Sequence, residues 1–302
     1  MRLTLVVNPV GSSVTPERRD EVEKALRAGH DVDVVETGQR GDATPAARRA
    51  AEAGADAVVV LGGDGTQNEA ANGLVGTSTA LAALPGGSTN VFARTLGFAK
   101  KLGPATDQLL TALANESRRR IGVGEVNGRV FLFHVGVGFD AAVVKHVEKR
   151  GHLKRTVGQA VFVVATFATL RSYDRSRPRF AVRFPHGEEV DGYFAVLLAS
   201  NPYTYLGKRP FNVAPDADFQ RGLAVLVFRD LKPGTIVRAA RSALGSGRRL
   251  SQDPRLVRRT DLDSLEVVGH GPFPYQVDGD YLGEVDGLEL SHRPSALDVV
   301  AP

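Results

Sequence analysis

The sequence predicts an α/β protein of two domains, a doubly wound parallel sheet followed by a β-sandwich. The first observation is the length of 302 residues, which fits two domains of about 100–200 residues each, with an ordinary globular composition of 42% hydrophobic and 24% charged residues. The second is an alternation of short apolar runs and helix-like segments up to residue 100. The third is a succession of strand-like segments from about residue 120 onward, separated by glycine- and proline-rich turns.

The N-terminal elements follow from local sequence. The apolar run Leu3–Val7 ends at Asn8-Pro9, which predicts a short strand. Thr15 followed by Pro16 predicts a helix start, because threonine caps the first turn and proline fits its first position; the helix extends to about Ala28. Further strands are predicted at residues 31–36, 57–61 and 81–84, and a second helix begins at residues 44–45. Apolar strands alternating with helices predict a parallel sheet covered on both faces.

The C-terminal half is predicted to be an antiparallel sandwich, because its strands come in runs, separated by turns or short helices, and do not alternate strictly with helices. The predicted strands are residues 130–137, 180–184, 193–199, 223–228, 264–268 and 288–290. We place the first domain at residues 1–120 and the second at residues 121–295. The last strand, residues 296–300, can return to the first domain or stay with the second.

Composition and hydropathy exclude several classes of protein. Without cysteine, the chain has no disulfide framework, no thiolate zinc site and no cysteine nucleophile. The run Leu3–Val7 is too short for the core of a signal peptide. The longest apolar stretch, Val157–Leu170, falls short of the roughly 20 residues that span a bilayer. We therefore expect a cytoplasmic protein.

Positive charge is concentrated in residues 140–260, which carry 22 Lys and Arg against 10 Asp and Glu. Such a block is typical of a protein that meets an anionic membrane, or of a solvated face. It contains no nucleic-acid-binding motif and few interleaved aromatic residues. We expect peripheral association with an anionic membrane surface and no nucleic-acid partner.

The most informative motif follows the apolar strand at residues 57–61 and reads Gly62-Gly63-Asp64-Gly65-Thr66-Gln67-Asn68-Glu69. Glycines let a backbone turn sharply and approach a ligand, and the helix N-terminus that follows offers free N–H groups to an anion. Thr66 and Glu69 also fit a capping box, which would be a purely structural role. A capping box does not explain Asp64 between glycines at the end of a strand, where a carboxylate can orient Mg²⁺ or a phosphate-bound water.

A second turn of this kind, Pro85–Asn90, follows the next strand, and polar or glycine-containing turns also end the first two strands. The carboxyl ends of the strands in an open α/β sheet form the edge where ligands bind. No Gly-x-x-x-x-Gly-Lys-[Ser/Thr] loop occurs, and no Gly-x-Gly-x-x-Gly follows the first strand. The sequence therefore predicts a ligand site at this edge that is neither a P-loop nor a Rossmann dinucleotide site.

The strings Gly62–Thr66 and Pro85–Asn90, together with Asn8-Pro9 and residues 37–43, resemble the catalytic domain of diacylglycerol kinases. The likeness extends to Gly136–Ala141 and to Gln276–Asp280, so it covers nearly the whole chain. The bacterial lipid kinase branch, related to sphingosine kinases, is the most similar. NAD kinases and phosphofructokinases share the Gly-Gly-Asp-Gly turn, which alone indicates only a superfamily.

The resemblance implies a kinase whose N-terminal domain binds ATP with Mg²⁺ and whose β-sandwich holds a lipid with one free hydroxyl. It implies that Asp64 holds the nucleotide magnesium and that a catalytic base, Asp278 or Asp280, lies in the late Asp-Gly-acid motif. The nucleotide contacts that it implies are Asn8, Pro9, Val10, Gly11, Ser12, Thr37, Gly62, Gly63, Asp64, Gly65, Thr66, Gln67, Asn68, Ser88 and Thr89.

Two positions depart from the family pattern. The family usually has glutamate where this chain has Asp280, one methylene shorter, so Asp278 becomes the first choice for the base. The family also has a second magnesium site in a Pro-x-Ala…Asp-Gly-Leu segment; here Asp218 is present, but Arg221 stands where the aspartate belongs. A guanidinium cannot ligate Mg²⁺, although it can fill the same space and pair with Asp218.

These observations predict an ATP-dependent phosphotransferase with an alcohol acceptor: a kinase of diacylglycerol or a sphingoid-type lipid that works at the membrane surface. One alternative is a soluble-substrate kinase of the NAD kinase type. The other is a nucleotide-binding regulator with weakened catalysis, which Arg221 and Asp280 keep open. The sequence leaves the acceptor lipid, the nucleotide preference and a homodimer open.

Overall fold

The computed structural model describes residues 1–148, 169 and 173–302, and it divides into two compact units. Unit 1 comprises Met1–Gly122 and Ser295–Pro302, and unit 2 comprises Val123–Pro294. Both divisions fall within strands, β5 (Arg118–Val126) and β16 (Asp280–Val300). Most of the apolar stretch at residues 157–170 lies outside the described residues. Among the helices that are described, none is long and apolar enough to cross a membrane.

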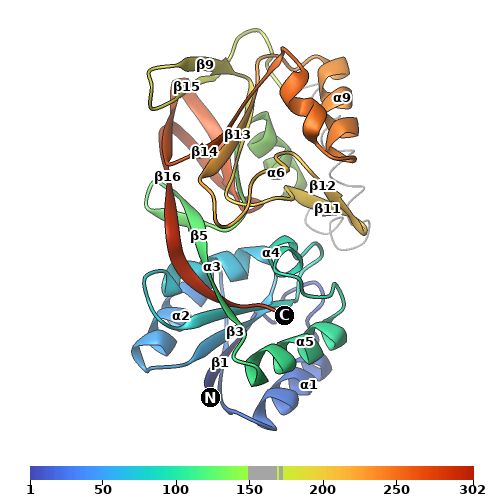
Figure 1. Ribbon diagram of the computed structural model, residues 1–302, viewed down its shortest axis with the longest axis vertical. Helices are drawn as coiled ribbons and strands as arrows, with labels where there is room; N and C mark the ends of the chain where they lie inside the picture. The colour runs from blue at the N-terminus through green and yellow to red at the C-terminus, as the bar shows by residue number, and fades with distance from the viewer. Residues whose placement is uncertain (149–168, 170–172) are drawn as a thin grey trace. The chain divides into compact units, whose positions relative to one another are not determined.

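Unit 1 is a parallel sheet between two layers of helices. Its strands lie in the order β2-β1-β3-β4, all parallel, and the end of β16 joins beside β4, where Val299 is opposite Leu81. Figure 1 shows α2 and α3 on one face of the sheet and α1 and α5 on the other. The elements are β1 (Arg2–Val7), α1 (Pro16–Arg27), β2 (Asp31–Glu36), α2 (Ala43–Glu52), β3 (Ala57–Gly62), α3 (Asp64–Leu74), β4 (Ala80–Pro85), α4 (Val91–Thr95) and α5 (Leu102–Ala114).

The local sequence explains these elements. Every residue of β3 and β4 is buried, because helices cover both faces of the sheet. Helix α1 starts as predicted: Thr15 Oγ1 accepts the N–H of Arg18 at 3.3 Å, and Pro16 occupies the first helical position. The predicted doubly wound sheet is confirmed.

Unit 2 is an antiparallel β-sandwich with helices packed on it, as predicted. Its main strand order is β14-β13-β10-β7-β15-β16, while β8 pairs with β15 and β9, and β5 with β6 and β16. The elements after β5 are β6 (Arg129–Phe131), β7 (His134–Gly138), α6 (Phe139–Glu148), β8 (Phe180–Arg183), β9 (Glu189–Gly192), β10 (Phe194–Leu198), β11 (Thr204–Leu206), β12 (Arg209–Phe211), β13 (Leu223–Phe228), α9 (Pro233–Ala243), the 3-10 helix η1 (Arg248–Gln252), β14 (Leu256–Leu262), β15 (Ser264–Val277) and β16.

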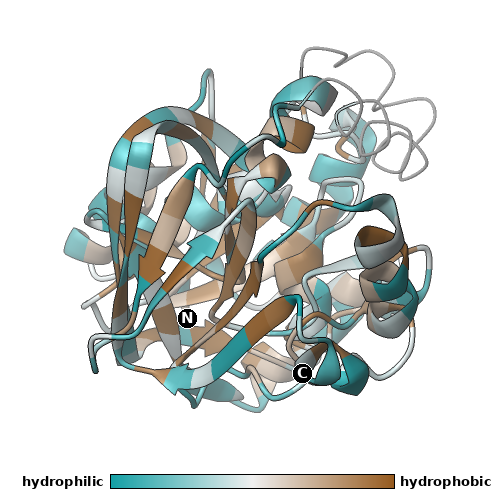
Figure 2. Cartoon of the chain, turned by 90° about the horizontal axis from the view of Figure 1, so that it is seen from above, coloured by the Kyte–Doolittle hydropathy of each residue, from teal (hydrophilic) through white to brown (hydrophobic). Residues whose placement is uncertain are grey.

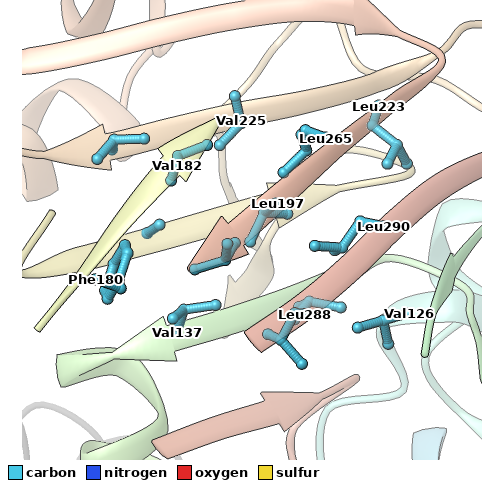
Figure 3. Packing of buried hydrophobic residues seen from close by; sticks show 14 of the residues in the cluster. Val126, Val137, Phe180, Val182, Leu197, Leu223, Val225, Leu265, Leu288 and Leu290 are labelled. Carbon is cyan, nitrogen blue, oxygen red and sulfur yellow. The ribbon is translucent and has the colours of Figure 1, made fainter. Parts of the chain in front are cut away.

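Strands β10 and β13 bury both faces. Ala195 and Leu197 of β10, with Val225 and Val227 of β13, point into the large core between the sheets, part of which Figure 3 shows. The residues between them point the opposite way, into a second cluster that includes Ala239 and Ala243 of α9. Successive side chains of a strand face opposite sides. Because both sides of β10 and β13 are covered by other parts of unit 2, nearly every residue of these two strands is apolar. Hydrophobic colour accordingly runs along the strands in Figure 2.

Candidate active site

Three loops at the carboxyl edge of the sheet in unit 1 are bound to one another through their backbones. The N–H of Asn8 donates to the carbonyl of Leu61 at 3.0 Å, and the N–H of Gly86 donates to the carbonyl of Gly62 at 2.9 Å. The N–H of Ser13 donates to the carbonyl of Gly86 at 3.0 Å. The turns after β1, β3 and β4 therefore form one continuous edge, as the placement of the motifs predicted.

Glycine is required where these loops touch. A Cβ on Gly86 would lie 2.7 Å from the nitrogen of Gly62, and a Cβ on Gly87 would lie 2.8 Å from the Cα of Gly63. Both distances are shorter than real Cβ contacts, and the atoms approached belong to backbone that cannot move aside cheaply. The two glycine turns thus pack against each other directly beside the N-terminus of α3, where backbone N–H groups can bind an anion.

Asp64 is the first residue of α3 and is partly buried. Its Oδ1 accepts the N–H of Phe92 at 3.0 Å, so it caps α4, the short helix that follows the second glycine turn. The Asn90 side chain bonds the backbone of Gly87 at 2.7 and 2.8 Å and makes no cap hydrogen bond to α4. Asp64 therefore ties the two turns together while its carboxylate remains at the edge where a nucleotide metal is predicted.

The predicted nucleotide contacts separate by exposure. Pro9, Val10, Ser12 and Ser88 are exposed, and Val10 is 71% exposed at the tip of its loop. Thr37, Thr66, Gln67 and Asn68 are buried. Asn8, Gly11, Gly63, Gly65 and Thr89 are intermediate, and Gly62 is buried.

The buried polar members of this set hold the edge together. The Asn8 amide donates to the hydroxyl of Thr66 at 2.9 Å and thereby connects the loop after β1 to α3. The amide of Gln67 donates to the carbonyls of Gly62 and Leu84, at 3.3 and 3.2 Å, and so joins the ends of β3 and β4. The Thr37 hydroxyl donates to the carbonyl of Val7 at 3.4 Å. These side chains shape the loops that would meet a nucleotide.

The capping-box interpretation of Thr66 and Glu69 is wrong. Helix α3 has Gly63 at its N-cap, and no side chain of the described residues makes a cap hydrogen bond there. Glu69 instead accepts the N–H of Gly41 at 2.9 Å and that of Ala43 at 3.3 Å, so it caps α2. A carboxylate is favourable at a helix N-terminus, and this one lies on the neighbouring helix, which local sequence cannot indicate.

In unit 2, Asp278 and Gly279 form the two-residue turn between β15 and β16. Their φ angles are +49° and +86°, and the strands on either side close at the pair Val277 and Asp280. Two positive φ angles are the hairpin geometry that an Asp-Gly pair favours. The turn places Asp280, which is partly exposed, at the first position of β16.

The carboxylate of Asp278 is only 4% exposed and faces the backbone of a neighbouring segment. Its Oδ2 accepts the N–H of Leu132 at 2.7 Å, and its Oδ1 accepts the N–H groups of Phe133 and His134 at 3.0 Å each. These bonds lie where the predicted strand 130–137 is interrupted between β6 and β7. The sequence favoured Asp278 over Asp280 as the base. Because both Asp278 oxygens already accept backbone hydrogen bonds, Asp278 is poorly placed to take a proton from a substrate.

A buried polar group connects this turn to α6. Asp140, the second residue of α6, accepts the hydroxyl of Tyr203 at 2.6 Å and the amide of Gln276 at 2.7 Å, and burial raises the pKa of its carboxyl. The amide oxygen of Gln276 accepts the N–H of Gly279 at 2.8 Å. The Asp278-Gly279 turn is thus held from both sides, by the Asp278 carboxylate and by the chain from Asp140 through Gln276.

Gly136 makes this connection possible. It lies opposite Gln276 in the register of β7 and β15, and a Cβ there would collide with the Asp140 carboxylate and the Gln276 amide. In the sequence, only a resemblance to the family motif distinguishes Gly136–Ala141. Local sequence does not predict that Gln276 and Tyr203 donate hydrogen bonds to Asp140. The one local sign of this contact is the missing side chain at Gly136.

His134 lies beside the same turn and is buried. Neither ring nitrogen has a hydrogen-bond partner among the described residues, and the ring packs on Tyr203 with centroids 4.2 Å apart. Burial lowers the pKa of His134 to about 3.

The second metal position has no support among the described residues. Asp218 is exposed and its Oδ1 accepts the N–H of Gln220 at 2.7 Å. From the sequence, the Arg221 guanidinium could pair with Asp218. In the structure it lies 3.6 Å from Asp261 instead. The nearby Asp216 is paired with Arg258. No group of three His, Cys, Asp or Glu residues in the described parts of the chain could hold a metal.

Family models match both units. A model of the diacylglycerol kinase catalytic domain matches residues 2–126, and a model of the YegS C-terminal NAD kinase beta sandwich-like domain matches residues 134–301.

Curated relatives match over nearly the full length. A protein of Pseudomonas aeruginosa PAO1 named "Probable lipid kinase YegS-like" is 30% identical, with 95% of this chain and 90% of the relative covered. The "Diacylglycerol kinase" of Bacillus subtilis is 27% identical, with 95% and 92% covered. Two crystal structures from Bacillus anthracis Sterne, one described as a diacylglycerol kinase, superpose with TM-scores of 0.77 and 0.73 at 21% and 19% identity; each covers all of this chain and 95% or 97% of its own. At such identities they show the fold alone.

Proposed function

We propose that this chain, which belongs to the family of diacylglycerol kinases and YegS-like lipid kinases, transfers the γ-phosphoryl group of ATP to the hydroxyl of a lipid at a membrane surface. The observation that carries the proposal is the pair of glycine turns packed on each other at the N-terminus of α3. Kinase chemistry depends on positioning and charge neutralisation more than on covalent catalysis, and backbone N–H groups at a glycine-lined edge supply both.

The residues at this edge fit a nucleotide carrying Mg²⁺. Mg²⁺ in kinases is commonly held by one or two carboxylates together with substrate phosphates and water, so the cluster of acids missing from the described residues is not required. Asp64 would be the protein ligand, and the bound ion would neutralise charge on the phosphates. The Phe92 N–H fixes the orientation of the Asp64 carboxylate. The exposed Ser88 and Ser12 would contact the phosphates or the ribose.

On the acceptor side, Asp280 replaces Asp278 as the proposed base. The hydroxyl oxygen of the lipid attacks the γ-phosphorus, the bond from that phosphorus to the ADP oxygen breaks, and the hydroxyl proton passes to the Asp280 carboxylate. Asp278 and Gln276 act as positioning residues that fix the turn before Asp280. A positioned base contributes about 10²–10⁴-fold to the rate.

The decisive experiment measures ATP turnover with diacylglycerol or a sphingoid base in mixed micelles, and with NAD in solution. We expect phosphorylated lipid, a requirement for Mg²⁺ and no phosphorylated NAD. Turnover with NAD alone would establish the soluble-substrate alternative. ATP binding without turnover on any of the three acceptors would establish the nucleotide-binding regulator.

A further inference from the structure

We propose that helix α9 and the 3-10 helix η1 after it dock this protein on an anionic lipid bilayer. The inference rests on the proposed function, since it names the surface through which a lipid kinase would reach its substrate. The docking surface is defined by five exposed side chains: Val237, Arg241, Leu244, Arg248 and Arg249.

The apolar part of the docking surface is a stripe on the outer side of α9. Thr235, Ala239 and Ala243 are buried on the inner side of the helix, and the two alanines pack into the second core cluster of unit 2. Val237 and Leu244 lie seven residues apart, or about two helical turns, on the opposite side, where they are 37% and 42% exposed.

Arg241 lies between these two side chains on the same stripe, so the stripe reads apolar, basic, apolar. The described residues contain just one other large hydrophobic side chain that is exposed, Val10, and it belongs to unit 1. Among the described residues of unit 2, the large hydrophobic side chains that are exposed therefore lie on α9 and at its C-cap.

The charge around the stripe is of one sign. Residues 231–252 contain five Lys and Arg and no Asp or Glu. The acidic residues that flank this segment in sequence are already paired: Asp253 lies 3.3 Å from Arg238, and Asp230 lies 3.8 Å from Arg255. Within the described parts of the chain, Arg241, Arg248 and Arg249 have no acidic partner. Three unneutralised guanidinium groups therefore flank two exposed apolar side chains.

A depression of about 380 Å³ adjoins the docking surface. Its lining residues are Arg238, Arg249, Gln252, Asp253, Pro254 and Arg255. Of its three arginines, Arg238 and Arg255 are paired with Asp253 and Asp230, so among the described residues Arg249 is the one left to bind a phosphate oxygen of a lipid headgroup.

The pattern favours a bilayer over a protein partner. A helix with a short apolar stripe and flanking basic residues lies in the bilayer interface, with its apolar side chains at the acyl boundary and its cations among the headgroups. Each Lys or Arg close to an anionic surface strengthens binding by about fivefold. Removing the charges of Arg241, Arg248 and Arg249 together should therefore weaken binding by roughly 100-fold.

The test is flotation of the full chain with vesicles of phosphatidylcholine, with and without phosphatidylglycerol. We compare the wild type with two variants, R241Q/R248Q/R249Q and V237S/L244S. The matched control is K24Q/R49Q/K101Q, which removes the same charge from exposed positions of unit 1. We expect the wild type and the control to bind only the anionic vesicles, more weakly as salt is added, and both docking variants to bind poorly.

Turnover with a short-chain, monomeric acceptor separates docking from catalysis, and both docking variants should retain it while they lose turnover on vesicles. Equal binding of the wild type and the arginine variant, or loss of binding in the control alone, would overturn the proposal. A dimer abolished by V237S/L244S, without vesicle binding by the wild type, would assign the stripe to a second copy of the chain. Vesicle binding through α9 in a protein that phosphorylates no lipid would refute the proposed function and leave the docking surface in place.

Discussion

The substitution Asp278→Asn distinguishes a positioning residue from a catalytic base. Asparagine can keep Oδ1 for the N–H groups of Phe133 and His134, but it turns an amide NH₂ toward the Leu132 N–H, where Oδ2 now accepts at 2.7 Å. A hydrogen bond to a charged group is worth about 1.5–3 kcal/mol, and the two bonds that survive lose their charge assistance. We expect Asp278→Asn to lower the free energy of unfolding by about 3 kcal/mol.

The assays are thermal unfolding followed by circular dichroism and turnover under saturating ATP. A loss of about 3 kcal/mol corresponds to a melting temperature lower by roughly 6–12 °C for a unit of this size. Asp280→Asn should leave the melting temperature nearly unchanged and lower turnover by at least about 10²-fold, whereas Asp280→Glu should keep activity. This reasoning would be refuted if Asp278→Asn were inactive but had the melting temperature of the wild type, while Asp280→Asn stayed active. Asp278 would then be the base.

Three further predictions concern the glycine edge and the buried histidine. Gly86→Ala should cost about 1–3 kcal/mol of stability and weaken ATP binding, because its Cβ meets backbone at 2.7 Å, whereas Gly29→Ala, with open space around it, should change neither; calorimetry of both variants checks this. Asp64→Asn should keep the fold, since its amide oxygen can still accept the Phe92 N–H, and should lose most turnover; unchanged activity with unchanged magnesium dependence would contradict its metal role. Burial lowers the pKa of His134 to about 3, so its neutral form stabilises the fold above pH 6.5, and that contribution is lost as the pH falls toward 3. In the part of the chain that the structure describes, neither His134 nitrogen has a hydrogen-bond partner, so His134→Phe should be tolerated and should flatten the loss of stability in acid, measured by denaturant unfolding at several pH values.

The fold class was predictable because it depends on periodicity. Buried strands such as β3 read as continuous apolar runs, and the Gly62-Gly63 turn marks its own position in the chain. The same logic places the loops of unit 1 at one edge, which the hydrogen bonds among them bear out.

What the sequence could not predict are contacts between distant segments. Glu69 and Thr66 have capping-box spacing, yet Glu69 caps α2 because tertiary packing brings another helix N-terminus to it. Asp278 has the local features of a base, but its burial depends on the backbone at Leu132, 146 residues away in the chain. Local sequence indicates a tight Asp-Gly turn and gives no sign of which carboxylate faces solvent.

The glycine at position 136 has a consequence for how the sandwich forms. A strand that is buried on both faces, as β7 is, can slide by one residue without exposing apolar side chains to water, so hydrophobicity alone does not select its alignment. A slip of β7 against β15 would bring Val135 or Val137 opposite Gln276, and the bulk of valine would close the gap through which Asp140 reaches it. In the misaligned pairing the buried Asp140 carboxylate would lose the Gln276 amide donor, and apolar contacts cannot offset the free-energy cost of an unpaired buried carboxylate. Gly136 and the hydrogen bond between Gln276 and Asp140 beside it therefore fix the register of β7 against β15.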